Sequence, residues 1–228
     1  MTLPSQESMP LRTAGAVPLI GFGTWRLSGR SSYEAVLHAL ATGYRHIDTA
    51  TMYGNEAEVG QAMRDSGLGR DEIFLTTKLL QDDADHPGQA IDASLRRLGT
   101  DYVDLWLIHW PPGGRASPKT WAQVLAQRER GKTRAAGVSN YSTDQVDELI
   151  AATGDSPTVN QVRWSPAIYD PAFARRMLRA RGRPRGLQPP ARDASGRPEP
   201  CRGGPAPRGE PGPGSPAVAH RAPRGSHP

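Results

Sequence analysis

The chain has 228 residues, enough for one domain with an appendage. It has no apolar run of about 18 residues and no basic start followed by an apolar stretch, so we expect neither a transmembrane helix nor a secretory signal. A single cysteine, Cys201, allows no internal disulfide and no cysteine-based metal site. We therefore expect a cytoplasmic protein without a metal.

The net charge of +5 would favour a nucleic-acid-binding protein, but that charge is unevenly placed. Residues 1–182 are neutral overall, and the excess lies in residues 183–228, which hold 8 arginines and 12 of the 22 prolines. This second segment has too few apolar residues to offset the entropy lost on ordering. We expect a folded part over 1–182 and a disordered tail over 183–228.

Short apolar segments alternate with amphipathic segments along the first part of the chain. The segments predicted to be strands are Pro18–Gly21, Arg45–Asp48, Ile73–Thr77, Leu105–Ile108, Ala135–Val138 and Val159–Gln161. The segments predicted to be helices are Ser32–Ala41, Glu56–Asp65, Gly88–Leu98, Thr120–Arg130, Thr143–Ala152 and Pro171–Ala180. Thr143 is expected to cap the fifth of these helices.

Repeated strand–helix units of about 30 residues indicate a parallel sheet, either a (β/α) barrel or a doubly wound sheet. The strands are apolar on both faces, as in a parallel sheet covered by helices. The first predicted strand is not followed by the G-x-G-x-x-G turn that binds dinucleotides, which argues against the doubly wound arrangement.

Polar side chains follow the predicted strands at the point where each ends. In a (β/α) barrel these ends form the rim that holds the active site. The residues are Asp48 and Tyr53 in HIDTATMYGNE, Lys78 in FLTTK, His109 in LWLIHWP, Ser139 and Asn140 in GVSNY, and Gln161 in VNQ.

These motifs, in this order and at this spacing, resemble the aldo-keto reductase family over roughly residues 9–182. The resemblance implies a (β/α)8 TIM barrel of which this chain supplies about six units. It also implies reduction of aldehydes or ketones to alcohols with hydride from NADPH; NADH is the alternative. By the same resemblance we expect a small carbonyl compound as substrate, a monomeric barrel when complete, and no membrane partner.

The resemblance assigns roles to four residues. Tyr53 would donate the proton, Lys78 would lower the pKa of Tyr53 through its charge, Asp48 would hold Lys78, and His109 would orient the carbonyl oxygen.

Further residues are implied to bind the ligands. Cofactor contacts are implied for Gly23, Thr24, Asp48, Ser139, Asn140 and Gln161. The substrate would lie against Trp25, Tyr53, His109 and Trp110, which favours an apolar or aromatic carbonyl compound.

Other interpretations of the same residues remain. Asp48 and Lys78 could form a structural ion pair, His109 could be a core histidine, and Asn140 and Gln161 could only tie down loops. Lys78 could also be the Schiff-base lysine of an aldolase.

The family's seventh strand, which should read like GVLEGYSP, is expected after Arg181, where this chain reads GRPRGLQP. One possible set of codons for GRPRGLQP, chosen among the synonymous ones, is GGC CGT CCT CGA GGG CTA CAG CCC, and removing one C after its first codon gives GVLEGYSP. We therefore expect a one-base frameshift near codon 183 and a truncated barrel. The alternative is a non-catalytic product whose basic segment Arg181–Gly186, similar to an AT-hook, binds nucleic acid weakly.

Overall fold

The computed structural model describes residues 7–11, 13, 15–163, 165, 170–172 and 175–176. The predicted tail, 183–228, lies outside the described residues. Of the predicted helix Pro171–Ala180, only residues 171–172 and 175–176 are described, and these four are helical. In the described part of the chain, no helix is long and apolar enough to cross a membrane.

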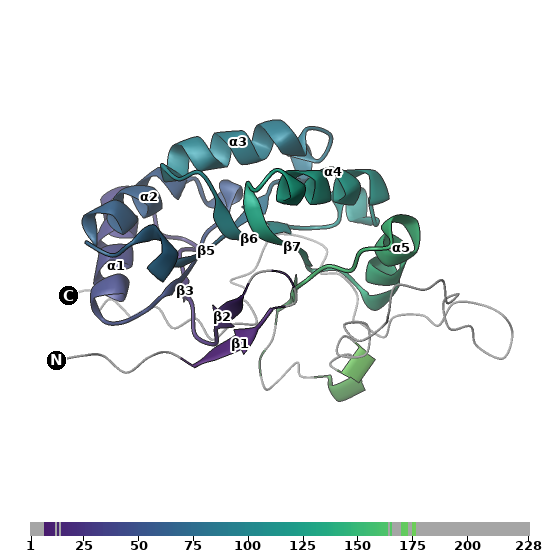
Figure 1. The fold of residues 1–228 in the computed structure, drawn as a ribbon, viewed down its shortest axis with the longest axis horizontal. Coiled ribbons are helices and arrows are strands. Elements are labelled where there is room, and N and C mark those ends of the chain that lie inside the picture. Colours follow the sequence, from purple (N-terminus) through teal and green to yellow (C-terminus); the bar gives the residue numbers. More distant parts are fainter. Residues whose placement is uncertain are drawn as a thin grey trace, which may run out of the picture.

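Six parallel strands form one curved sheet, in the same order as in the sequence (Figure 1). They are β3 (Phe22–Gly23), β4 (His46–Asp48), β5 (Phe74–Leu79), β6 (Val103–Ile108), β7 (Thr133–Ser139) and β8 (Asn160–Gln161). Sequential order with every neighbour parallel is the arrangement of a (β/α) barrel, not of a doubly wound sheet.

The first predicted strand, Pro18–Gly21, is wrong in its bounds. The chain instead forms an antiparallel hairpin from β1 (Ser8–Pro10) and β2 (Ala16–Pro18), and enters the sheet only at β3. Residues 19–21 lie between the two, because the hairpin pairs Ser8 with Pro18 and then ends.

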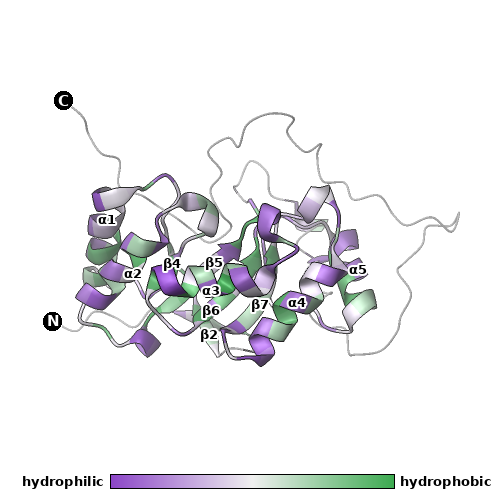
Figure 2. Cartoon of the chain, turned by 90° about the horizontal axis from the view of Figure 1, so that it is seen from above, coloured by the Kyte–Doolittle hydropathy of each residue, from purple (hydrophilic) through white to green (hydrophobic). Residues whose placement is uncertain are grey.

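Five helices cover the outer face of the sheet in an arc (Figure 1). They are α1 (Gly29–Ala41), α2 (Glu56–Asp65), α3 (Pro87–Leu98), α4 (Pro118–Glu129) and α5 (Thr143–Thr153). The five corresponding predictions were right in place and type. Figure 2 shows hydrophobic residues on the central strands and both kinds of residue on the helices, as expected for helices with one buried face.

Alternate residues of each strand face opposite sides of the sheet. In β5, Leu75 and Leu79 join the large outer core that the helices cover, whereas Phe74 belongs to a smaller inner cluster. Val17 of the hairpin packs in that inner cluster, so the hairpin covers part of the inner face. Lys78 lies four residues after Phe74 and therefore on the same, inner face of the sheet, at the opposite end of the strand.

A charged cluster joins the beginnings of three strands. The buried carboxylate of Asp104 accepts bonds from Arg70 (2.8 Å), Arg134 (3.0 Å) and the backbone N–H of Leu75 (2.9 Å). The guanidinium groups of Arg70 and Arg134 also lie 4.1 and 4.2 Å from the ring centre of Tyr102. This cluster fixes the amino ends of the strands, away from the predicted active-site rim.

Candidate active site

The carboxyl ends of the strands bring the predicted polar residues together on the inner side of the sheet. Asp48 ends β4, Lys78 lies one residue before the end of β5, and His109 directly follows β6. Ser139 and Gln161 end β7 and β8 and are paired in register.

Lys78 is the centre of this group. Its ammonium is 1% exposed; it forms an ion pair with Asp48, donates to the backbone oxygen of Thr49 (2.9 Å) and lies 3.4 Å from the hydroxyl of Tyr53. Tyr53 comes from the 3-10 turn η1 (Thr51–Tyr53), which is separated from β4 by only two residues and so stays near the end of that strand. One ammonium thus holds a carboxylate and contacts a phenol.

Two aromatic rings pack against the ring of Tyr53. The ring of Trp25 lies 4.9 Å from that of Tyr53, and the ring of His109 lies 5.8 Å away, edge-on at 76°. Trp110 stacks near His109 and is 43% exposed. The rings of Trp25 and Trp110 thus lie beside the phenol and the imidazole.

The amide and hydroxyl residues of the rim are bonded to one another. Ser139 donates to the backbone oxygen of Gln161 (2.9 Å), and Asn140 donates to the backbone oxygen of His109 (3.1 Å). Gln161 donates to Asp48 (2.8 Å). These bonds tie the strand ends together, as the structural interpretation of Asn140 and Gln161 expected.

Several polar atoms of these residues remain available to bind a ligand. Within the described residues, the amide oxygens of Asn140 and Gln161 accept no hydrogen bond, and Nδ1 of His109 is buried without a partner. Thr24 is fully buried and bonded to the backbone oxygen of Asp48, while Gly23 pairs with Asp48 in register. The two amide oxygens suit the N–H₂ of a carboxamide.

Burial and charge set the proton affinities in this group. Burial raises the pKa of Tyr53, and although the charge of Lys78 lowers it in part, burial has the larger effect. Burial works against the charged form of Lys78, but Asp48 and Tyr53 outweigh it and raise the pKa of Lys78. Burial, followed by the charge of Lys78, lowers the pKa of His109 to about 3. The expected action of Lys78 on Tyr53 is thus present in direction, but the pKa of Tyr53 is raised overall.

Two residues beside the site were not predicted. Asn55 is fully buried and bonds to Thr49 and to the loop that carries Trp25. The carboxylate of Glu56, 1% exposed, accepts from Thr77 (2.6 Å) and from Arg97 (2.8 Å). Both residues stand in the GNE segment, but apart from Thr49 the partners named here lie 21 to 41 residues away, and a contact at that separation leaves no signal in the sequence.

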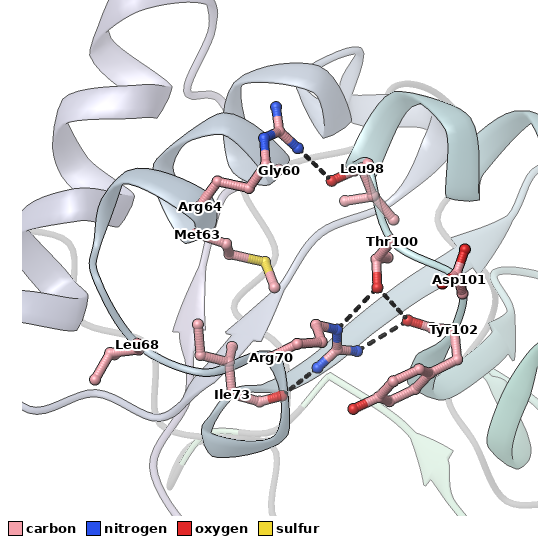
Figure 3. A pocket seen from close by; sticks show the side chains of 11 residues that line it. Gly60, Met63, Arg64, Leu68, Arg70, Ile73, Leu98, Thr100, Asp101 and Tyr102 are labelled. Atoms are coloured by element: carbon pink, nitrogen blue, oxygen red, sulfur yellow. Dashed lines mark hydrogen bonds between the residues drawn. The ribbon is translucent and has the colours of Figure 1, made fainter.

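A pocket of about 430 Å³ lies at the other end of the strands, between α2, α3 and the beginnings of β5 and β6 (Figure 3). Its main cation, Arg70, is saturated by protein atoms: Thr100, Asp104 and the backbone oxygens of Ile73 and Tyr102. Arg64 likewise donates to the backbone of Leu98 (3.0 Å). The polar groups of this pocket serve the fold and do not assemble a reactive centre.

The profile of the "Aldo/keto reductase family" matches residues 19–183, which is most of the chain. The chain belongs to the aldo/keto reductase family. Among curated relatives, glycerol 2-dehydrogenase (NADP(+)) of Saccharomyces cerevisiae is 42% identical over 193 residues, covering 72% of this chain and 62% of that protein. Methylglyoxal reductase of Yersinia pestis is 43% identical over 164 residues, covering 72% and 59%.

Solved structures of this family superpose on the same part of the chain. An aldo/keto reductase from Brucella melitensis has a TM-score of 0.69 at 41% identity, covering 72% of this chain and 64% of that one. The Bombyx mori aldo-keto reductase in complex with NADP has a TM-score of 0.72 at 31% identity, covering 78% and 64%. The aldo/keto reductase described here therefore spans about three fifths of the length of its relatives, and its described strands form a partial barrel.

Proposed function

We propose that this chain carries the catalytic rim of an NADPH-dependent carbonyl reductase that converts aldehydes or ketones to alcohols. The observation that supports it most directly is the contact of Lys78 with both Asp48 and Tyr53 at the strand ends. The relatives named glycerol 2-dehydrogenase (NADP(+)) and methylglyoxal reductase act in the same chemical class.

The pKa values divide the roles between Tyr53 and His109. A carbonyl that gains hydride needs one proton on its oxygen. With a pKa of about 3, His109 is neutral near pH 7 and has one N–H to donate as a hydrogen bond but no acidic proton to give. Tyr53 keeps its proton because its pKa is raised, and Lys78 beside it stabilises the phenolate that remains. We therefore assign proton donation to Tyr53 and orientation of the carbonyl oxygen to His109.

The state of Lys78 argues against the aldolase alternative. A Schiff base forms from a neutral amine, which requires a lowered lysine pKa. Here Asp48 raises the pKa of Lys78, so the ammonium form is favoured.

The cofactor would lie against the inner rim. A bound nicotinamide nucleotide would supply the hydride. Its carboxamide fits the amide groups of Asn140 and Gln161, next to Ser139, with Gly23 and Thr24 on the opposite strand. The choice of NADPH over NADH rests on the relatives whose names or titles include NADP.

The aromatic rings beside Tyr53 and His109 support the substrate class expected from the sequence. Trp25 and Trp110 flank Tyr53 and His109, which suits a small apolar or aromatic carbonyl compound. We propose a cytoplasmic enzyme that is monomeric when its barrel is complete.

We further propose that residues 1–182 are the family's part of the chain and that residues 183–228 are read out of frame because of a one-base frameshift near codon 183. The test is to sequence the gene across codons 178–190 and to compare the 228-residue chain with the frame-restored protein. We expect the first to be inactive and the second to oxidise NADPH with an aromatic aldehyde. Full turnover by the purified 228-residue chain would refute the truncation, and a restored protein that folds without any turnover would refute the proposed function.

A further inference from the structure

Asn55 occupies an unusual place for a residue at the start of a helix. It is the N-cap of α2, where an asparagine side chain ordinarily accepts a hydrogen bond from the first turn, yet its side chain makes no such bond. Instead, its Nδ2 donates to the backbone oxygens of Thr24 and Leu27, both at 2.9 Å, and its Oδ1 accepts from the hydroxyl of Thr49 (2.8 Å). The side chain is directed entirely toward two loops of the rim.

The first of these loops is strained. Residues 24–27 form a turn closed by a bond from the N–H of Leu27 to the oxygen of Thr24 (3.1 Å). Inside this turn Arg26 has a φ of +65°, a left-handed conformation that costs energy for any residue with a Cβ atom. The two carbonyls that Asn55 binds stand on either side of Arg26. Such a conformation persists only where surrounding contacts fix it, and Asn55 supplies two of them.

The second loop follows β4 and contains Thr49. Thr49, whose hydroxyl reaches Asn55, also gives its backbone oxygen to the ammonium of Lys78 (2.9 Å). Asn55 therefore connects the turn that carries Trp25 to the residue that holds Lys78. The ring of Trp25 packs against Tyr53 at 4.9 Å.

We propose that Asn55 is a positioning residue. It holds the strained turn 24–27, which includes Trp25, in a fixed position relative to Tyr53 and Lys78. It acts through the loops and touches no reacting atom. The inference rests on the proposed function only in taking Trp25 as a wall of the substrate pocket. Its tests measure geometry and not turnover, so they remain informative if the chain has no reductase activity.

Asn55→Asp is the sharpest variant, because it keeps the shape of the side chain and replaces the Nδ2 donor by an oxygen. That oxygen would face the carbonyls of Thr24 and Leu27 and repel both. Asn160→Asp is the matched control, because Asn160 also donates to a backbone oxygen, that of Tyr141 (2.8 Å), which lies outside the turn 24–27.

The first measurement is native-state trypsin cleavage followed by mass spectrometry. Arg26 lies in the strained turn and Arg30 lies four residues on, in the first turn of α1, where its side chain is 88% exposed. Asn55→Asp should raise cleavage after Arg26 relative to Arg30 by about tenfold, the order of change expected when one buried hydrogen bond is lost. Asn160→Asp should leave the ratio unchanged. General destabilisation would raise both cleavages together and would overturn the proposal.

The second measurement is ¹⁹F NMR of the chain labelled with fluorotryptophan, with Trp25 assigned through Trp25→Phe. Asn55→Asp should move the Trp25 signal and leave the signals of the buried Trp106 and Trp121 in place. Adding Arg26→Gly should restore the Trp25 signal, because glycine adopts a positive φ without strain. If Asn55→Asp does not fold, Asn55→Ser removes the same donors without adding a charge. An unmoved Trp25 signal in a folded Asn55 variant would overturn the proposal.

Discussion

The side-chain amide of Gln161 lies 2.8 Å from the carboxylate of Asp48, although 113 residues separate them in the sequence. Asp48 thus has one oxygen on Lys78 and the other on Gln161. Gln161, on the last described strand of the sheet, thereby positions the Asp48 carboxylate, which forms the ion pair with Lys78. Gln161 has a role in the protein itself, beside any contact with a cofactor.

Gln161→Leu should therefore destabilise the fold by about 1–3 kcal/mol, because it removes a hydrogen-bond donor from the buried Asp48 carboxylate. Gln161→Glu should destabilise it more near pH 7, since two carboxylates would then face each other, and should recover relative to Gln161→Leu as the pH is lowered and one carboxyl is protonated. Urea unfolding of both variants at several pH values measures this. Equal losses at every pH would show that the contact with Asp48 carries little energy.

Tyr53→Phe, made in the frame-restored protein, should lower turnover by about a hundredfold or more, the usual contribution of a general acid. Cofactor binding should be retained, because only the proton donor is removed. Tyr44→Phe is the control: its ring packs edge-on against Phe22, away from the rim, and it should keep normal turnover. Steady-state kinetics and fluorescence titration with NADPH separate the two effects. Normal turnover by Tyr53→Phe would show that Tyr53 is not the proton donor.

The low pKa of His109 predicts a loss of stability in acid. Its folded pKa is about 3, below the unfolded value of about 6.5, so the unfolded chain binds the extra proton first as the pH falls. The stabilisation is complete above the unfolded pKa and is lost as the pH falls from there toward the folded pKa. Within this window one such group contributes a slope of up to about 1.4 kcal/mol per pH unit.

His109→Gln should make the unfolding free energy less dependent on pH between about 6 and 4, compared with the unsubstituted chain. His38→Gln, at an exposed position of α1, should leave the slope unchanged. Urea unfolding across this range gives the three slopes. Identical slopes for His109→Gln and the unsubstituted chain would mean that His109 titrates normally in the folded state.

Gly60 in α2 and Gly88 in α3 should respond oppositely to alanine. A Cβ on Gly60 would lie 2.0 Å from the backbone oxygen of Leu98, so α2 and α3 would have to separate. A Cβ on Gly88 would meet only the flexible end of Gln127, at 3.3 Å. Gly60→Ala should cost at least the roughly 1–3 kcal/mol typical of overpacking, whereas Gly88→Ala should be neutral or stabilising by up to about 1 kcal/mol. Thermal unfolding compares them directly.

The sequence allowed the sheet, five helices and the rim residues to be predicted because each depends on a local or repeating pattern. In FLTTK, the alternation that turns Leu75 outward also turns Lys78 inward. The hairpin was missed because β1 (Ser8–Pro10) is short and exposed and contains a proline, so no apolar alternation marks it. The cap of α5 was placed one residue late: Ser142, not Thr143, accepts from the N–H of Gln145 (3.2 Å). Two adjacent hydroxyl residues could each serve, and only the backbone conformation distinguishes them.

The contacts of Asn55 were beyond sequence reasoning for a different reason. Its donors bind the backbone oxygens of Thr24 and Leu27, and every residue type carries such an oxygen. The balance of burial against the charge of Lys78 at Tyr53 was equally inaccessible, because it depends on how deeply the phenol is enclosed.

The carboxylate of Asp104 has a consequence for how the sheet opens. Through Arg134 and the N–H of Leu75 it joins β5, β6 and β7 at the second residue of each strand, and Arg70 adds a bond from the segment before β5. Opening any one of these strands would strip partners from a buried charge, so the three should open as a single cooperative unit. Their amide hydrogens should then exchange with solvent at one common free energy, while the two-residue strands β3 and β8 at the borders of the sheet exchange earlier.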